Sequence, residues 1–466
     1  MKILSLILVI LGLTAGRVTG APDIPALWAE RVKSVVAVEF YVETETDRQP
    51  GLSYGTVVDN NGTIILPSAA VDPRVSPDQL KDFKVHRAGE AASVPGRYLG
   101  QDNLTGWHFV RVDASLLPGL TPITTFAAKA GAPAPGPALA EEVWGIGLRN
   151  KDEDFIPYIM VARVGLLQSL PQHSAIALHE LAAPGLPVFN ADGVFLGLAT
   201  SSFGQSFLQF SRPDRGGSAV ILVNVEESSV FHLADEVLPN LGRIPASVSG
   251  RPLAWLGAYG LEPLDPEVAQ FMKLDSQGAV VVSEVLEGSP AEKAGLKDRD
   301  IIVALDGHPL PRFKPGSVVV SYIDRELARR LPGDMLAVTV MRGTERTDIK
   351  VALGDEPKLI REAARKYFDR LGLTVREFVY GDAVALRVKI GESTGVVAHF
   401  VKPNSPVAVA GLHADDWIKE IDGVEVKTFD VAVNKLAAIE ADHERSEFVI
   451  LASRGGETAV LRVKLK

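Results

Sequence analysis

The chain has 466 residues, of which 46% are hydrophobic and 23% are charged, a balance typical of globular proteins. This length is too great for one ordinary core and predicts about three domains. Asp and Glu outnumber Lys and Arg by 58 to 48, and no basic run is present that could follow a phosphate backbone, so nucleic-acid binding is disfavoured. Cysteine is absent, which excludes disulfides, a lipid-modified cysteine anchor and a thiol nucleophile.

Residues 1–20 have the pattern of a secretory signal peptide. Lys2 precedes an apolar run from Ile3 to Leu13, and small residues follow this run. The run is too short to serve as a stable membrane anchor. We expect cleavage after Gly20, with cleavage after Gly16 as the alternative. The mature protein is then expected to be periplasmic or secreted.

Residues 21–245 are predicted to form a mainly β domain. Between Ser34 and Phe210, short β-branched runs such as SVVAVEFYV, GWHFVRV and GVFLGLAT alternate with Gly, Pro, Asn and Asp. Runs at this spacing indicate an antiparallel barrel or sandwich and not βαβ units. An Ala/Pro/Gly-rich stretch at 127–142 is typical of a surface connection, and residues 238–251 are expected to form the boundary to the next domain.

The C-terminal half contains an internal repeat, which predicts one domain at 250–355 and a second at 358–466. The Ser-Pro pair at 289–290 aligns with the pair at 405–406, and the Asp-Gly pair at 306–307 aligns with the pair at 422–423 at the same separation. Two large copies are too few for a solenoid. The pattern in each copy predicts a strand, a helical turn closed by Gly, and two strands joined by the Asp-Gly turn.

A longer helix is predicted in each copy, at 318–331 and at 429–441. This combination of elements resembles a PDZ domain, in the circularly permuted form found in bacterial proteases. Arg299 and Asp415 stand where that family usually has Gly in the turn before a strand, and Asp at least tolerates a positive φ.

The PDZ resemblance implies peptide binding by addition of a strand to a sheet edge, with capture of a terminal carboxylate by successive backbone N–H groups. By resemblance, the carboxylate loops are Leu256, Gly257 and Ala258 in the first copy and Leu371, Gly372 and Leu373 in the second. Two alternatives stay open. Each Leu-Gly pair could belong to an ordinary strand with a glycine bulge, and the second copy could serve assembly.

A barrel of this kind followed by two PDZ domains behind a signal peptide resembles the HtrA (Deg) family of periplasmic, trypsin-like serine proteases. The resemblance implies a chymotrypsin-like double β-barrel followed by two α+β PDZ domains. It also allows the catalytic positions to be compared. The histidine position is Ala69 in SYGTVVDNNGTIILPSAAV (53–71), the aspartate position is Gly106 in DNLTGWHFVR (102–111), and the serine position is Pro184 in AAPGLPVFN (182–190).

None of the three positions carries the side chain that catalysis needs. Proline also has no backbone N–H, whereas the oxyanion hole of this fold uses the N–H of the nucleophile itself. His108 lies two residues beyond Gly106 and is expected to share its face, as a partly exposed polar residue. Ser68 is expected to point to the face opposite Ala69 and to be structural. No histidine spacing typical of a metal site and no cofactor motif is present, so no cofactor is predicted.

The sequence therefore predicts an exported HtrA-like pseudoprotease whose PDZ domains bind C-termini of polypeptides or unfolded exported proteins, as a chaperone, adaptor or regulator. By resemblance, the barrel domain would form a homotrimer through its N-terminal segment, with Ile24, Leu27 and Trp28 as candidate contacts. Association with active homologues is the other assembly considered. Two alternatives remain: a serine-type endopeptidase with non-standard catalytic residues, and a structural envelope scaffold.

Overall fold

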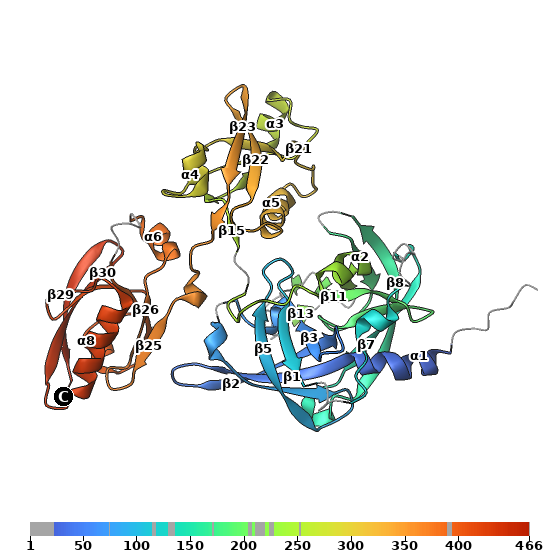
Figure 1. Ribbon diagram of the computed structural model, residues 1–466, viewed down its shortest axis with the longest axis horizontal. Coiled ribbons are helices and arrows are strands. Elements are labelled where there is room, and N and C mark those ends of the chain that lie inside the picture. Colours follow the sequence, from blue (N-terminus) through green and yellow to red (C-terminus); the bar gives the residue numbers. More distant parts are fainter. Residues whose placement is uncertain are drawn as a thin grey trace, which may run out of the picture.

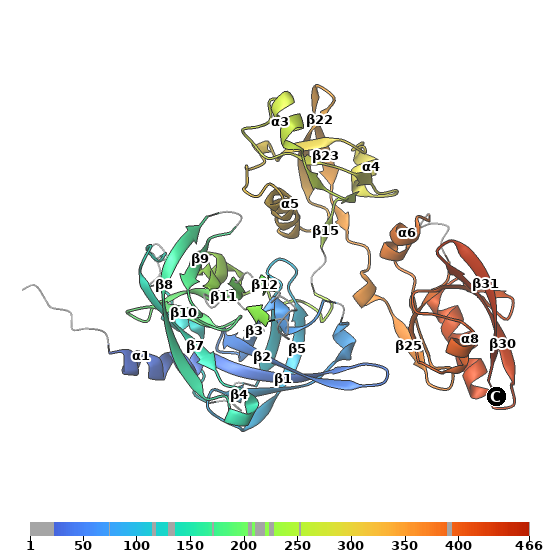
Figure 2. The same cartoon turned by 180° about the vertical axis from the view of Figure 1, so that it is seen from behind.

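A computed structural model describes residues 23–73, 75–113, 118–128, 136–169, 172–203, 207–209, 220–222, 228–250, 253–388 and 394–465. The expected signal peptide lies outside the described residues. Strands dominate, and they form a double barrel followed by two smaller β modules, as Figure 1 and Figure 2 show from opposite sides. The prediction of a mainly β fold is confirmed. No helix within the described ranges is long and apolar enough to cross a membrane.

The first barrel is closed by six antiparallel strands in the order β1-β2-β3-β6-β5-β4. Alternation along β1 explains how it serves two cores, because successive side chains point to opposite faces. Val36, Val38 and Phe40 fill the first barrel, whereas Val35 and Ala37 join the core of the second. The strands are β1 (Val35–Glu43), β2 (Arg48–Val57), β3 (Thr63–Leu66), β4 (Leu80–Arg87), β5 (Ser93–Gln101) and β6 (His108–Val112).

The second barrel is also closed by six strands, in the order β10-β11-β14-β9-β8-β7. A short strand pair, β12 (Phe207–Gln209) with β13 (Val220–Leu222), stands apart from it. The helix α2 (Ala234–Val237) follows the last barrel strand. The barrel strands are β7 (Glu142–Leu148), β8 (Pro157–Gln168), β9 (Ser174–Leu178), β10 (Pro187–Asn190), β11 (Phe195–Phe203) and β14 (Ser228–Leu233).

The helix α1 (Ile24–Arg31) precedes the first barrel strand and packs on the second barrel. Leu27 and Trp28 contact the core there, and the Trp28 ring lies 6.4 Å from that of Trp144. Asp23 caps the helix by accepting a hydrogen bond from the Ala26 N–H at 3.3 Å. Packing on its own barrel therefore accounts for the position of Trp28. The trimer contact expected of this segment stays a prediction.

The first module is formed by β15 to β24, around a five-strand path β17-β18-β20-β22-β23. Its longer helix ends at Ala328, three residues before the predicted end. The elements are β15 (Ala254–Trp255), β16 (Ala258–Tyr259), β17 (Glu262–Pro263), α3 (Pro266–Phe271), β18 (Val280–Val281), β19 (Glu284–Val285), α4 (Pro290–Ala294), β20 (Ile301–Leu305), β21 (His308–Pro309), α5 (Val318–Ala328), β22 (Met335–Arg342), β23 (Glu345–Ala352) and β24 (Gly354–Asp355).

The second module is formed by β25 to β31, in the path β25-β26-β27-β28-β30-β31. Its longer helix spans the predicted range. The elements are β25 (Arg365–Phe368), β26 (Leu373–Glu377), α6 (Tyr380–Leu386), β27 (Val396–Val401), α7 (Pro406–Val409), β28 (Trp417–Ile421), β29 (Val424–Glu425), α8 (Phe429–Ala441), β30 (Glu447–Arg454) and β31 (Glu457–Lys464).

The two modules share the same helix caps, turns and carboxylate–arginine ion pair, as the sequence repeat suggests. Ser289 and Ser405 are the N-caps of α4 and α7, each accepting a backbone N–H with its hydroxyl. Arg299 and Asp415 both have φ near +67°, so both non-glycine residues adopt the left-handed turn. Each module also holds one carboxylate that is 1% exposed against an arginine, Asp300 with Arg342 and Asp416 with Arg454.

Polar contacts join the modules to the barrels. In Figure 1 the hairpin of β1 and β2 reaches toward the second module, where Glu45 accepts a hydrogen bond from the Thr374 hydroxyl at 2.9 Å. Helix α5 of the first module lies beside α2, and Arg325 pairs with Glu236 at 2.7 Å. The two modules touch through the edge-to-face pair of Trp255 and Tyr380, with ring centroids 5.2 Å apart.

A buried ion pair inside the second module yields a stability prediction. Arg376 and Asp382 form two hydrogen bonds at 2.6 and 2.7 Å, with side chains 4% and 10% exposed. Changing Arg376→Met leaves a buried carboxylate without its cation, so we expect the module to lose about 3 kcal/mol of stability. Hydrogen exchange of the β28 and β30 amides measures this loss for the module separately from the barrels.

The double variant Arg376→Met/Asp382→Leu is the matched control. It removes both charges, so most of the lost protection should return. If the double variant were as unstable as the single one, shape and not the unpaired charge would explain the loss.

Candidate functional site

The three predicted triad positions lie around one segment, residues 67–69. Ala69 is in a short 3-10 turn, η2 (Ser68–Ala70), that follows β3. Gly106 is in the turn between β5 and β6, and a Cβ added to it would lie only 2.9 Å from the Ser68 Cβ. Pro184 precedes Gly185, where an added Cβ would lie 2.6 Å from the Pro67 ring. The fold thus brings these positions together, while their role as former catalytic positions stays a prediction.

The loop that carries Gly106 is held by a buried carboxylate. Asp102, 0% exposed, accepts hydrogen bonds from the Thr105 N–H at 3.0 Å and the Thr105 hydroxyl at 2.9 Å. Arg243 donates to both of its carboxylate oxygens, at 3.0 and 3.1 Å. The turn closes through a 2.8 Å hydrogen bond from the Gly106 N–H to the Asp102 carbonyl, and Gly106 has a φ of +71°. Asp102 and Thr105 therefore build the turn.

The two backbone amides that follow Pro184 are engaged in hydrogen bonds within the protein. Pro184 has no N–H, and the next amide, that of Gly185, donates to the Ala199 carbonyl at 2.8 Å. The Leu186 N–H donates to the Ala183 carbonyl at 3.1 Å, and the Gly185 carbonyl accepts from the Thr56 hydroxyl at 2.7 Å. These bonds tie the loop to its own barrel and to β2.

Two sequence expectations about neighbouring side chains are wrong. His108 is 3% exposed and thus buried, at the start of β6, where it lines a pocket together with Val71 and Arg361. Ser68 does not point away from the site but lies against Gly106. The alternation of a strand does not apply to it, since residues 68–70 form a 3-10 turn with three residues per turn.

His108 is held as a neutral imidazole. Its Nδ1 accepts a hydrogen bond from the Tyr98 hydroxyl at 2.8 Å. Its Nε2 lies 3.4 Å from the backbone carbonyl oxygen of Ser68. Burial lowers the pKa of His108 to about 4, and burial also raises the pKa of Tyr98 above its ordinary value. With both ring nitrogens engaged and this pKa, His108 is a poor general base at neutral pH.

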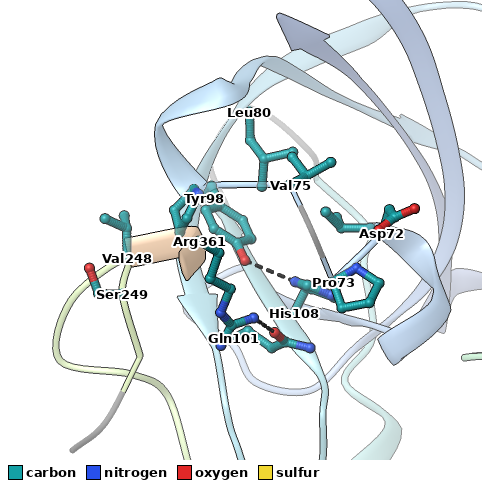
Figure 3. A pocket seen from close by; sticks show the side chains of 12 residues that line it. Asp72, Pro73, Val75, Leu80, Tyr98, Gln101, His108, Val248, Ser249 and Arg361 are labelled. Atoms are coloured by element: carbon teal, nitrogen blue, oxygen red, sulfur yellow. Dashed lines mark hydrogen bonds between the residues drawn. The ribbon is translucent and has the colours of Figure 1, made fainter. Parts of the chain in front are cut away.

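A small pocket opens beside this histidine, and Arg361 forms part of its wall. Figure 3 shows Tyr98 directed at His108 and Arg361 directed at Gln101, with the 2.6 Å bond from Arg361 to the Gln101 amide oxygen drawn as a dashed line. Arg361 lies just before β25 and far from the barrel in sequence, so no sequence pattern pointed to it. Val248 and Ser249, at the expected domain boundary, line the same pocket.

The predicted carboxylate loops have closely similar geometry in the two modules. Gly257 and Gly372 have φ of +83° and +68°, and an added Cβ would lie 2.1 Å from the Ser289 Cβ or 2.3 Å from the Ser405 Cβ. Glycine is therefore required by the contact with the helix N-cap, quite apart from any ligand. The binding role of these loops stays a prediction.

The other residues of the two loops belong partly to the cores. Leu256 and Leu371 are 3% and 0% exposed, and Leu373 is 0% exposed at the start of β26. Ala258 is half-buried at the start of β16. Among the described residues, no group of three or more His, Asp or Glu side chains gathers that could hold a metal ion.

Comparisons with known proteins agree with this architecture. A family model described as a PDZ domain matches residues 281–328. A probable periplasmic serine endoprotease, DegP-like, from Rhizobium meliloti is 25% identical over 298 residues, which cover 60% of this chain and 51% of that protein. The protein of the same description from Chlamydia pneumoniae is 23% identical over 280 residues, again 60% and 51% of the two chains.

The chain is similar to DegP-like serine endoproteases over part of its length, and one segment of it matches a PDZ domain. It spans about half the length of the curated relatives that it matches. A solved HtrA-type protease, a variant of AlgW with a decapeptide, shares the fold with a TM-score of 0.50 at 15% identity, covering 72% of this chain and 98% of the other. Such a similarity describes the fold, and the chemistry of this chain depends on its own residues.

The contact between Gly106 and Ser68 yields a second prediction. Gly106→Ala should lower the free energy of unfolding of the barrels by about 2 kcal/mol, because the new Cβ meets Ser68 and φ is positive. Gly119→Ala is the matched control, since Gly119 also has positive φ, at +87°, but no atom lies within 4 Å of its added Cβ. Urea unfolding of both variants measures the difference.

Equal losses in the two glycine variants would contradict the contact. Relief of the Gly106→Ala defect by Ser68→Gly would identify Ser68 as the obstructing group. The same contact would obstruct an aspartate at this position.

Burial of His108 yields a pH prediction. Its folded pKa of about 4 lies below the ordinary value of 6.5, so between these values the unfolded chain binds a proton that the folded chain does not. The contribution of His108 to the free energy of unfolding is therefore fully present above pH 6.5. This contribution decreases as the pH falls toward 4, by at most about 3 kcal/mol. Urea unfolding at a series of pH values should show a shallower acid loss for His108→Gln than for the wild type.

The exposed His443 is the control for this measurement. The His443→Gln variant is measured beside His108→Gln as the same substitution at an exposed position. A His108→Gln curve parallel to the wild-type curve would mean that His108 titrates alike in the folded and unfolded chains.

Proposed function

We propose that the protein is an exported HtrA-like pseudoprotease that binds C-termini or extended segments of other polypeptides and does not hydrolyse them. The observation that carries the proposal is the set Ala69, Gly106 and Pro184, which offers no base, no acid and no nucleophile. Such a protein would act as a chaperone, adaptor or regulator. After loss of residues 1–20 it would work in the periplasm, as the names of its relatives say of them.

The packing around these positions supports the loss of hydrolysis. Restoring a serine at 184 would still leave an aspartate at 106 opposed by Ser68. The Gly185 N–H already donates a hydrogen bond to the Ala199 carbonyl. Removing a single oxyanion donor typically costs about 10²–10³ in rate, in addition to the loss of the triad.

The edge of β16 in the first module supports peptide binding. The Leu286 N–H donates to the Gly257 carbonyl at 2.9 Å, so this pair faces the neighbouring strand β19. In an antiparallel ladder the next residue, Ala258, then directs its N–H and carbonyl to the opposite edge. Within the described ranges, β16 has no strand partner other than β19. An extended peptide needs an edge with free backbone groups of this kind.

A serine-type endopeptidase is the second candidate, favoured by the names of the curated relatives. It would need a nucleophile outside the three positions. For assembly, a homotrimer through α1 or association with active homologues is proposed by family resemblance. The domain division at 21–245, 250–355 and 358–466 is likewise our proposal.

The test combines binding and cleavage on one sample of mature protein. A C-terminal peptide library is screened by fluorescence anisotropy, each hit is repeated as its C-terminal amide, and casein cleavage is assayed in parallel. We expect saturable binding that needs the free carboxylate, without cleavage. Ala258→Pro removes one N–H from the open edge while sparing the β19 ladder, so affinity should fall about tenfold or more.

Ala258→Val is the matched control, because it enlarges the side chain but keeps the N–H. Gly257 is unsuitable for this purpose, since any side chain there collides with Ser289. Cleavage that survives purification and disappears in a single point variant would establish the endopeptidase. Neither binding nor cleavage would favour the structural scaffold.

A further inference from the structure

The two modules differ in the path of the segment that enters the Leu-Gly loop. In the first module the Leu253 carbonyl accepts from the Glu356 N–H at 3.0 Å, and β15 pairs with β24. The entering segment therefore leaves the edge of β16 uncovered by any strand that the structure describes.

In the second module the entering segment folds back as β25 and pairs with β26. Their register runs from Phe368 opposite Leu373 to Arg365 opposite Arg376, and β27 pairs with the other edge of β26. The Glu377 N–H donates to the Ala364 carbonyl at 2.8 Å. By alternation, the pairs of Lys366 with Val375 and of Phe368 with Leu373 are then the hydrogen-bonded ones. Both edges of β26 are thus occupied.

The strand β25 has the direction and position expected of a bound peptide. A peptide that adds to β26 with its terminus at Gly372 must run antiparallel to β26 and end at the loop, and β25 does both. The Gly372 N–H, predicted to capture a carboxylate, donates instead to the Phe368 carbonyl at 2.8 Å. In the described part of the first module, the Gly257 N–H donates no backbone hydrogen bond.

The occupied loop is also fastened to the helix that flanks it. The Arg370 N–H donates to the Glu440 carboxylate at 3.0 Å. The Arg370 guanidinium donates to the carbonyls of Ile439, Glu440 and Asp442 at the end of α8, at 3.3, 3.1 and 2.7 Å. Carbonyls at a helix C-terminus lack partners within the helix and attract cations, so this contact stabilises the closed loop.

The other end of β25 is held on the first barrel. Arg361 donates to Gln101 at 2.6 Å, and Arg365 donates to Gln79 at 3.3 Å. Phe368 is 0% exposed in the core of the second module. An external peptide would have to break the ladder between β25 and β26 and compete with a segment whose effective concentration is on the order of mM.

We propose that β25 is the resident ligand of the second module, so that external C-termini bind the first module alone. This inference rests on the peptide-binding function proposed above. The second module then serves as an anchor that holds the linker and its Arg361 on the first barrel. The wild-type protein should bind one peptide per chain.

The first experiment measures stoichiometry by titration calorimetry, with the tightest C-terminal peptide of the library. We expect one site in the wild type and in Ala258→Val, and no site in Ala258→Pro. Two sites in the wild type, or one remaining site in Ala258→Pro, would overturn the resident-ligand proposal while leaving peptide binding intact. No site in the wild type would instead contradict the proposed function.

The second experiment opens the occupied edge in the Ala258→Pro background. Lys366→Pro removes the N–H that faces Val375, whereas Lys366→Ala removes the same exposed side chain and keeps the N–H. The synthetic peptide with the sequence of residues 361–368 and a free C-terminus is the probe. It should bind the Lys366→Pro protein at least tenfold more tightly than the Lys366→Ala protein. Equal affinity for both would contradict the proposal.

Hydrogen exchange checks that Lys366→Pro acts as intended. Amides of β26 should lose protection while those of β28 and β30 keep it. Unchanged protection of β26 would mean that β25 is not its partner and would overturn the proposal. If β28 and β30 were exposed as well, the module would have unfolded, and the stoichiometry of Ala258→Pro would decide the question.

Discussion

The close approach of residues 67–69 to Gly106 and Gly185 is the constraint on which the candidate site depends. In a protease of this fold the same approach would bring a base, an acid and a nucleophile within hydrogen-bonding reach. Here it brings together Pro67, Ser68 and two glycines, and backbone and apolar atoms fill the space. The inter-barrel core, which β1 supplies through Val35 and Ala37, keeps the two halves of this site in place. The packing between these segments is therefore sufficient to hold the arrangement, independently of any chemistry at the site.

The periodic features of the chain could be predicted from the sequence. Alternating runs indicated barrel strands, and the Ser-Pro and Asp-Gly pairs marked the helix caps and turns of the repeat. These features depend on local backbone geometry, which neighbouring residues decide. The left-handed turn at Arg299 was less expected than that at Asp415, because Arg bears the steric cost that glycine avoids, whereas Asp tolerates a positive φ.

Features that depend on distant segments could not be predicted. His108 is buried beside a pocket that it shares with Val71 and Arg361, and Arg361 comes from the segment just before β25. The orientation of Ser68 could not be predicted from strand alternation, because residues 68–70 form a 3-10 turn. The pairing of β25 with the edge of β26 could likewise not be predicted from the sequence. The repeat suggested two equivalent grooves, whereas the entering segments diverge just before the point where the copies begin to match.

The different entry paths also set the order in which the modules can assemble. In the second module the pairing of Phe368 with Leu373 closes a very short loop, so the β25–β26 hairpin forms early. In the first module Ala254 must find Asp355 at the opposite end of the module, and this contact carries the loop-closure entropy of nearly the whole module. The pairing of β15 with β24 is thus completed late in folding. The hairpin that covers one edge of β26 can therefore form before the two ends of the first module meet.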